Sequence, residues 1–154
     1  MKMCRGFTLL ELMVTIAVLA ILATVGVPSF QTLVQNNRVV TQTNELVSVL
    51  NVARTEAVKR GRPVEVEISS EANGWSATVR LPGGADAIRV VERPDSGIAL
   101  VTGDPVVVTF TATGVPEAAV TFNLSPKSGC KGQQVRQIAL GPSGQITTTK
   151  QACP

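Results

Sequence analysis

The amino-acid sequence predicts an α+β fold, in which one long N-terminal helix packs on a C-terminal antiparallel β-sheet. Three observations predict it. Residues 7–27 are apolar except for one acid, apolar residues then recur at helical spacing up to residue 60, and short β-branched segments follow. The 154 residues are enough for one modest domain and an anchor, and they contain no internal repeat or long linker.

The apolar run over residues 7–27 has the length of a membrane-spanning helix. At about 1.5 Å per residue it spans roughly 30 Å, the thickness of a bilayer core. Lys2 and Arg5 precede it, as they would on the cytoplasmic side of a single-pass anchor. A secretory signal peptide fits less well, because the run is long, contains Glu11 and has no obvious cleavage site after it. A carboxylate at this depth costs about 2.5–3.5 kcal/mol on insertion scales, so Glu11 requires a functional explanation.

Residues 29–60 are predicted to form an amphipathic helix after an interruption at Gly26 and Pro28. Proline removes a backbone donor and is expected to kink the helix or open it locally. The apolar positions beyond it fall on one face, which is expected to pack on the segments that follow: Val39, Leu46, Leu50, Ala53 and Ala57.

The end of this helix is predicted at Gly61 and Pro63, a left-handed cap residue followed by a residue that cannot continue a helix. Glu56 precedes Arg60 by one helical turn, so their side chains are expected to form an ion pair. The long helix therefore has an apolar first half and a second half with one apolar stripe.

The remainder of the chain is predicted to consist of short strands, separated by turns rich in glycine, proline, asparagine and aspartate. Their pattern indicates one antiparallel sheet, with one face on the helix and the other partly exposed. The expected strands are residues 63–69, 74–81, 87–92, 105–110, 119–124, 135–140 and 144–150.

The N-terminal residues MKMCRG followed by FTLLE resemble the class III signal of type IV prepilins and type II secretion pseudopilins. The resemblance implies a pilin-like fold, cleavage after Gly6 by a membrane prepilin peptidase, and N-methylation of the new N-terminus, Phe7. Glu11 then becomes the fifth residue of the mature chain, where this family carries its near-invariant acid. The implied organisation is a cleaved leader at 1–6, a transmembrane and assembly segment at 7–28, an amphipathic half-helix at 29–61 and a periplasmic β-sheet domain at 62–154.

The same resemblance explains the acid within the apolar run. Cleavage before Phe7 creates an ammonium group in the apolar layer, where Glu11 of a neighbouring subunit is able to pair with it. The two charges neutralise each other at a depth where neither is tolerated alone. Assembly relieves that cost and sets the axial register, so Glu11 and Pro28 are the predicted assembly residues.

Residues 53–68, ARTEAVKRGRPVEVEI, resemble the end of the long helix and the first strand in the GspH/FimT group of this superfamily. Trp75, which follows Asn73 and Gly74, also matches that group, whereas residues 82–118 match it weakly. The motif is expected to be structural and to identify the group without carrying chemistry.

The cysteines predict one disulfide. Cys4 lies in the leader, whereas Cys130 and Cys153 lie in the exported domain. In an oxidising periplasm these two are expected to be bridged. Closing a loop of this length stabilises a fold by about 3 kcal/mol in the chain-entropy model.

No constellation in the sequence predicts an enzyme, a cofactor or a metal. The chain has no histidine, which excludes histidine-based acid–base catalysis, histidine-activated nucleophiles and histidine-ligated metals. No Asp/Asn-rich loop surrounds the acids of the first strands, so a solvated strand face is preferred over a calcium site. The acids considered for that site are Glu65, Glu67, Glu71 and Asp86.

The resemblance leaves three functions open. The preferred one is a structural minor pilin that primes or caps a type IV pilus, and the alternative is the minor pseudopilin H of a type II secretion system. The third is a DNA-binding minor pilin that serves natural transformation. The implied partners are the prepilin peptidase, other pilins or pseudopilins, an inner-membrane assembly platform and membrane lipid, and the C-terminal domain is expected in the periplasm before it enters a pilus or pseudopilus.

DNA is not expected as a physiological partner. Transformation-linked FimT-type proteins carry a Gly-Arg-x-Arg motif near the C-terminus, whereas residues 144–147 of this chain read GQIT. Without Lys2 and Arg5, the 14 basic residues fall to 12 against 11 acidic ones, so the exported part is almost neutral. A weak basic patch around the disulfide would consist of Lys127, Lys131, Arg136 and Lys150.

Overall fold

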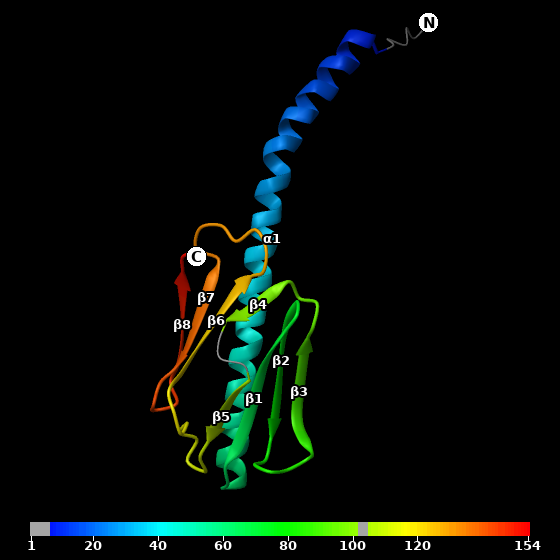
Figure 1. The fold of residues 1–154 in the computed structure, drawn as a ribbon. Coiled ribbons are helices and arrows are strands. Elements are labelled where there is room, and N and C mark those ends of the chain that lie inside the picture. Colours follow the sequence, from blue (N-terminus) through cyan, green and yellow to red (C-terminus); the bar gives the residue numbers. More distant parts are fainter. Residues whose placement is uncertain (1–6, 102–104) are drawn as a thin grey trace, which may run out of the picture. The chain divides into compact units, whose positions relative to one another are not determined.

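The computed structural model describes residues 7–101 and 105–154 (Figure 1). The predicted leader, with Cys4 and Gly6, lies outside these residues. Within them the chain forms one helix, α1 (Leu9–Arg60), and eight strands. The strands are β1 (Val64–Glu71), β2 (Gly74–Arg80), β3 (Ala87–Arg93), β4 (Ile98–Val101), β5 (Val106–Phe110), β6 (Val120–Pro126), β7 (Val135–Leu140) and β8 (Ile146–Gln151).

The chain divides into two compact units, Met1–Val34 and Gln35–Pro154. The first unit contains the apolar beginning of α1, where an 18-residue window has a mean hydropathy of 2.4 and no buried residue. Large apolar side chains are exposed there, for example Leu10 at 73% and Ile21 at 67%. By length and composition alone, this helix is able to cross a membrane.

The sequence predicted an interruption of the helix at Gly26 and Pro28, and this prediction is wrong. α1 continues through both residues, so the local opening does not occur in the described helix. A single proline removes only one backbone donor, and the surrounding turns keep their own hydrogen bonds. The hydroxyl of Thr32 adds to them by donating to the carbonyl of Pro28 at 3.0 Å.

The strands of the second unit form two antiparallel sheets, where the sequence predicted one. Their orders are β3-β2-β1-β5 and β4-β6-β7-β8 (Figure 1). The second sheet needs β4, which has only four residues and was not predicted. After β3, Gly97 donates to the carbonyl of Asn73 at 2.9 Å, and β4 then pairs with β6 instead of β3. The predicted fold class is confirmed. The pairing of β4 with β6 divides the strands into two sheets.

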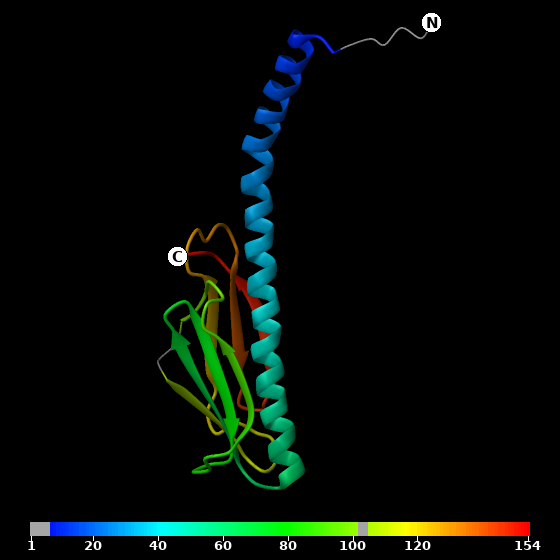
Figure 2. The same cartoon turned by 90° about the vertical axis from the view of Figure 1, so that its right-hand side faces the viewer.

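One apolar core lies between the second half of α1 and the two sheets (Figure 2). The helix face predicted from the spacing is confirmed, because all five of its residues have 0% exposure. The sheets contribute alternate residues, and the largest fully buried side chains are Trp75, Phe110 and Phe122. Burial of such large apolar groups is the main favourable term in forming this unit.

Two polar contacts fix α1 against the first sheet. The indole Nε1 of Trp75 donates to Oε1 of Gln42 at 2.8 Å in the buried interior. At the edge of the sheet, the Arg93 guanidinium donates to both carboxylate oxygens of Glu45, at 2.5 and 2.9 Å. The hydrogen bond and charge of Glu45 raise the pKa of Arg93 above its ordinary value. Hydrogen-bonding side chains from helix and sheet therefore define how the two pack.

Candidate functional site

The predicted assembly acid lies in the first turn of α1. The backbone N–H of Glu11 donates to the Thr8 hydroxyl at 3.2 Å, so Thr8 caps the helix. This cap was not predicted, although the Thr-x-x-Glu spacing is a known helix-start signal. An acid near a helix N-terminus is favoured by the helix dipole by about 0.3–1 kcal/mol. Glu11 and Phe7 are both exposed within the described residues, and Phe7 is 76% exposed.

The motif at residues 53–68 has a structural role that the sequence did not specify. Arg54 extends from α1 to the β7–β8 turn, where its Nη1 donates to the carbonyl of Gly144 at 2.9 Å. Gly114, in the turn after β5, lies against the same arginine. A Cβ on Gly114 would lie 2.8 Å from Val58, and one on Gly144 would lie 3.0 Å from the Gly114 carbonyl.

Both glycines also have positive φ values, 77° and 78°, that side chains rarely adopt. Arg54 thus joins turns from the two sheets to the helix. We call the set Arg54, Gly114 and Gly144 the arginine clamp. It gives Arg54, one of the polar residues of the motif, a structural role.

The proposed basic patch does not form as one surface. Arg136 is only 7% exposed, and its guanidinium donates to Asn36 Oδ1 at 2.8 Å and to the Gln133 carbonyl at 2.8 Å. This arginine serves internal hydrogen bonds and is not available to a phosphate. The burial of Arg136 could not be predicted from the sequence, because its partner Asn36 lies 100 positions away in the chain.

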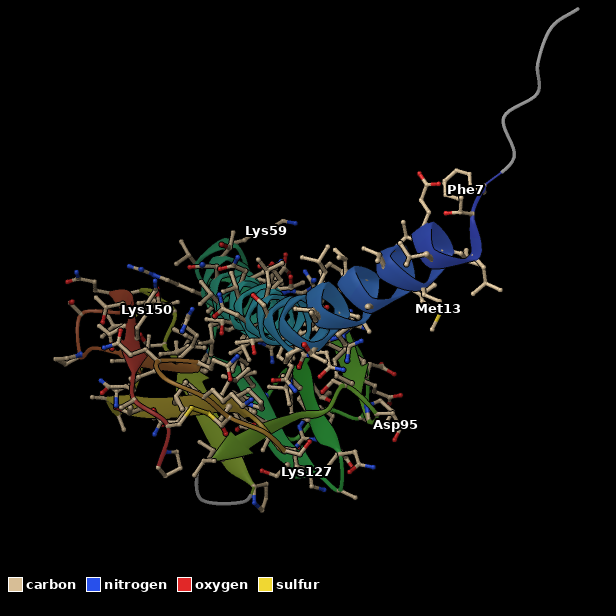
Figure 3. All side chains as sticks on the ribbon, turned by 90° about the horizontal axis from the view of Figure 1, so that it is seen from above. Phe7, Met13, Lys59, Asp95, Lys127 and Lys150 are labelled. Atoms are coloured by element: carbon tan, nitrogen blue, oxygen red, sulfur yellow. A yellow bond between two sulfur atoms is a disulfide. The ribbon has the colours of Figure 1, made fainter. Side chains whose placement is uncertain are left out.

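The three lysines of the predicted patch, Lys127, Lys131 and Lys150, are exposed. Lys127 donates to the Asn73 side chain at 2.8 Å and to the Ala72 carbonyl. Viewed from above, Lys127 and Lys150 lie on different sides of the β-sheet unit (Figure 3). Lys131 follows Cys130, and its backbone N–H donates to Gln134 at 2.7 Å. Of the four predicted residues, Arg136 is therefore buried, and Lys127 lies on a different side of the unit from Lys150.

The predicted disulfide is confirmed. Cys130 and Cys153 are bonded, with a Cα–Cα distance of 5.9 Å and a sequence separation of 23. Beside the bridge, the Cys153 N–H donates to the Gly132 carbonyl at 2.9 Å. The bridge attaches the C-terminal segment beyond β8 to the loop before β7.

Three of the four acids considered for calcium, Glu65, Glu67 and Glu71, have partners within the chain. Arg80 lies 2.8 Å from the Glu67 carboxylate and 3.9 Å from that of Glu65. Glu71 accepts a hydrogen bond from the Ser76 hydroxyl at 3.1 Å. Across residues 7–101 and 105–154, no group of three His, Cys, Asp or Glu residues is placed to hold a metal ion.

Two family models match the chain. Residues 42–144 match the family described as type II transport protein GspH, and residues 1–27 match the prokaryotic N-terminal methylation motif. The first match covers α1 from residue 42 onward, strands β1 to β7 and the arginine clamp. The second covers the predicted processing site and the apolar helix.

Known proteins agree with these matches. Two fimbrial proteins of Pseudomonas aeruginosa are each 30% identical over 106 residues, which is 66% of this chain and 68% of theirs. The crystal structure of the type IV minor pilin FimU from the same organism has a TM-score of 0.52 at 21% identity, covering 72% of this chain and 96% of that one.

The fold is therefore that of a type IV pilin, with one long N-terminal helix on antiparallel sheets. The chain belongs to the GspH family of type IV minor pilins and pseudopilins. Its methylation motif implies processing by a prepilin peptidase, and proteins of this family are structural components that assemble with other pilins.

Proposed function

We propose that this chain is a minor pilin that is incorporated into a type IV pilus, in the priming or tip complex. The observation that carries the proposal is the exposed apolar beginning of α1, with an acid in its first turn. Such a helix has no stable place in water and requires lipid or neighbouring helices. The similarity to two fimbrial proteins favours a pilus over other filaments.

The proposed assembly step follows from the geometry at the helix start. The prepilin peptidase cuts after Gly6, and Phe7 becomes the methylated N-terminus of a chain anchored in the inner membrane. The backbone N–H of Glu11 donates to the Thr8 hydroxyl, which fixes the start of the helix. The Glu11 carboxylate, which is not tolerated alone in an apolar layer, takes an intermolecular partner. That partner is the N-terminal ammonium of an adjacent subunit, and the inner-membrane assembly platform brings the subunits together while the β-sheet unit stays in the periplasm.

A type II secretion role is the second candidate, because the matching family model is described as a type II transport protein. The two functions share processing, anchor and fold, so the filament has to be identified in the cell. Deletion of the gene should reduce surface pili recovered by shearing and leave secretion of exported hydrolases unchanged. The opposite outcome, normal pili with hydrolases retained in the periplasm, would assign the chain to the secretion system. Re-expression of the wild-type chain is the control for both readouts.

A further inference from the structure

Strand β8 leaves one edge of the second sheet open. It is the last strand in the order β4-β6-β7-β8, and residues 147–151 are all exposed (Figure 1). Thr148 and Lys150 are exposed even though the residues opposite them in β7, Ile138 and Arg136, are buried. Both side chains therefore lie on the face of the sheet that packs on α1, but beyond the part of it that the helix covers.

The hydrogen bonds of the β7–β8 hairpin show which backbone groups point outward. The Gly141 N–H donates to the Gln145 carbonyl at 2.8 Å, so these two residues form a hydrogen-bonded pair. Such pairs alternate along an antiparallel ladder, which makes the pairs of Ile146, Thr148 and Lys150 non-hydrogen-bonded. The N–H and C=O groups of these three residues point away from β7, and no other described strand pairs with them. They form a row of donors and acceptors that a further strand is able to use.

The other edges of the two sheets are protected against such pairing. β3 carries three charged residues, one of which, Arg93, is held by Glu45. The chain after β5 returns along its free edge, where the Glu117 N–H donates to the Thr109 carbonyl at 2.9 Å. β4 has only four residues. Charges, covering segments and short strands are the usual devices that keep sheet edges apart. β8 has six residues, no proline and one charge, so it is the least protected edge of the described chain.

The one charge of β8 is not neutralised within the described residues. Lys150 lies directly opposite Arg136, so two cations face each other across the strand pair. The Arg136 guanidinium donates to neutral groups, such as the Asn36 side chain, and neither cation forms an ion pair with a described residue. Like charges directly opposite each other are destabilising. An acidic side chain placed beside Lys150 would relieve this repulsion.

We propose that β8 binds an extended segment of another protein chain, which adds a strand to the second sheet and places an acidic side chain beside Lys150. An extended backbone matches a row of outward N–H and C=O groups, as in other cases of strand addition. β8 itself contains no acid, so the same strand of a second copy does not supply the missing charge. Next to Ile146, which packs partly buried against the core, the added strand is expected to carry an apolar residue. This binding goes beyond the proposed pilus function and does not depend on it.

The test uses the full chain in detergent micelles and a synthetic peptide of alternating threonine and valine that carries one glutamate. Amide hydrogen exchange, followed residue by residue by NMR, is the readout. In the free chain the amides of Thr147 and Thr149 should exchange slowly, because they donate to β7, and the outward amide of Thr148 should exchange fast. The peptide should slow exchange at Thr148 at least about tenfold, with a Kd of about 1 mM or tighter. The same peptide with every amide N-methylated should have no effect, because it has no backbone donors.

Two variants separate the backbone contact from the charge. Thr148→Pro removes the outward N–H but no hydrogen bond to β7, so it should unfold like the wild type and lose peptide binding. The wild type should bind the glutamate peptide more tightly than the same peptide with glutamine, and salt should reduce that preference. Lys150→Gln should bind both peptides equally. Thr147→Val is the matched control, because it changes a side chain on the other face of β8 and no outward backbone group, and it should bind like the wild type.

Three results would overturn the proposal. One is the absence of protection at Thr148 with the glutamate peptide at up to about 10 mM. Another is equal binding of the glutamate and glutamine peptides by the wild type, which decides the matter even if Thr148→Pro fails to fold. The third is protection of Thr148 that increases with the concentration of the chain itself and is not displaced by the peptide, which would assign this edge to a second copy. Because the assay needs no filament, its result is independent of the proposed pilus function.

Discussion

At the scale of single residues, Arg54 joins parts of the folded subunit, and Glu11 is proposed to act in assembly. Arg54 connects α1 to the turns at Gly114 and Gly144, which belong to different sheets. Glu11 lies at the exposed start of the helix, and within the described residues its carboxylate has no hydrogen-bond or ion-pair partner. One residue acts within the subunit, and the other is expected to act between subunits.

Replacement of the clamp arginine should destabilise the fold. Arg54→Met keeps most of the aliphatic length but leaves the Gly144 carbonyl without its donor, at a cost of about 1–3 kcal/mol. Thermal unfolding of the purified chain, followed by circular dichroism, measures the change. Arg62→Met, at an exposed position just beyond α1, is the matched control and should unfold like the wild type. Equal stability of the two variants would remove the clamp from the explanation of the motif.

Replacement of the assembly acid should separate processing from assembly. Glu11→Val leaves cleavage and membrane insertion intact but should lower incorporation into filaments several-fold, because the adjacent ammonium loses its partner. Incorporation is measured in sheared pili or by crosslinking to the major subunit. Gly6→Val is the contrasting variant, since it should accumulate as an unprocessed precursor. Wild-type incorporation of Glu11→Val would contradict the pairing.

At the scale of elements, the end of α1 is stabilised by charge. Glu56 pairs with Arg60 at 2.7 Å, as predicted, and with Lys59 at 3.6 Å. The Arg60 hydrogen bond is the main cause that lowers the pKa of Glu56 below its ordinary value of 4.5. The cations also lie at the negative end of the helix dipole. The last turn of α1 thus depends on ionised Glu56.

This pair predicts a pH dependence with a definite sign. Because the pKa of Glu56 is lower in the folded chain, its contribution is complete above 4.5 and disappears as the pH falls through the lowered value. Glu56→Gln should therefore lower the unfolding temperature slightly at neutral pH, and the difference from the wild type should vanish at an acidic pH below the lowered pKa. Calorimetry at both pH values measures it. A difference that persists at low pH would mean that the carboxylate charge is not responsible.

At the scale of the whole molecule, the second unit is an almost neutral domain closed by one disulfide. Its cations are distributed around the surface, or buried in the case of Arg136. The disulfide attaches the C-terminal segment beyond β8 covalently to the loop before β7. Stability at this end of the chain is therefore expected to depend on the bridge.

Removal of the disulfide should loosen the β-sheet unit. Cys153→Ser should lower its stability by about 2–4 kcal/mol, as expected for a loop of this length. Denaturant unfolding of the oxidised wild type, the reduced wild type and the variant provides the comparison. The last two should agree, and Cys4→Ser should match the oxidised wild type. A reduced wild type as stable as the oxidised one would contradict a structural role for the bridge.

The unit should bind DNA weakly. At about 150 mM salt, residues 35–154 should show a Kd weaker than about 1 μM in a gel-shift titration, because separated lysines neutralise few phosphates. Binding at low salt should decline steeply as salt is added. Submicromolar affinity that is lost in a Lys131→Ala, Lys150→Ala double variant would restore the DNA-binding function to consideration.

The sequence by itself determined the elements and their buried faces. The stripe from Val39 to Ala57, seven of the eight strands and the pairing of Cys130 with Cys153 follow from local spacing, turn residues and cysteine number. These features depend on neighbours in the chain or on simple counting. Only β4 was missed as an element, since four residues do not establish an alternation.

Tertiary structure alone decided which elements meet. Alternation fixes the face that a strand buries, but not its neighbour, so the division into two sheets could not be predicted. Long polar side chains are subject to the same limit. Arg54 donates to a residue 90 positions away, and Arg136 to one 100 positions away. Folding brings these residues together, and their spacing in the sequence does not indicate it. The unpaired oxygen of Asn123 likewise appears only when neighbouring strands bury it.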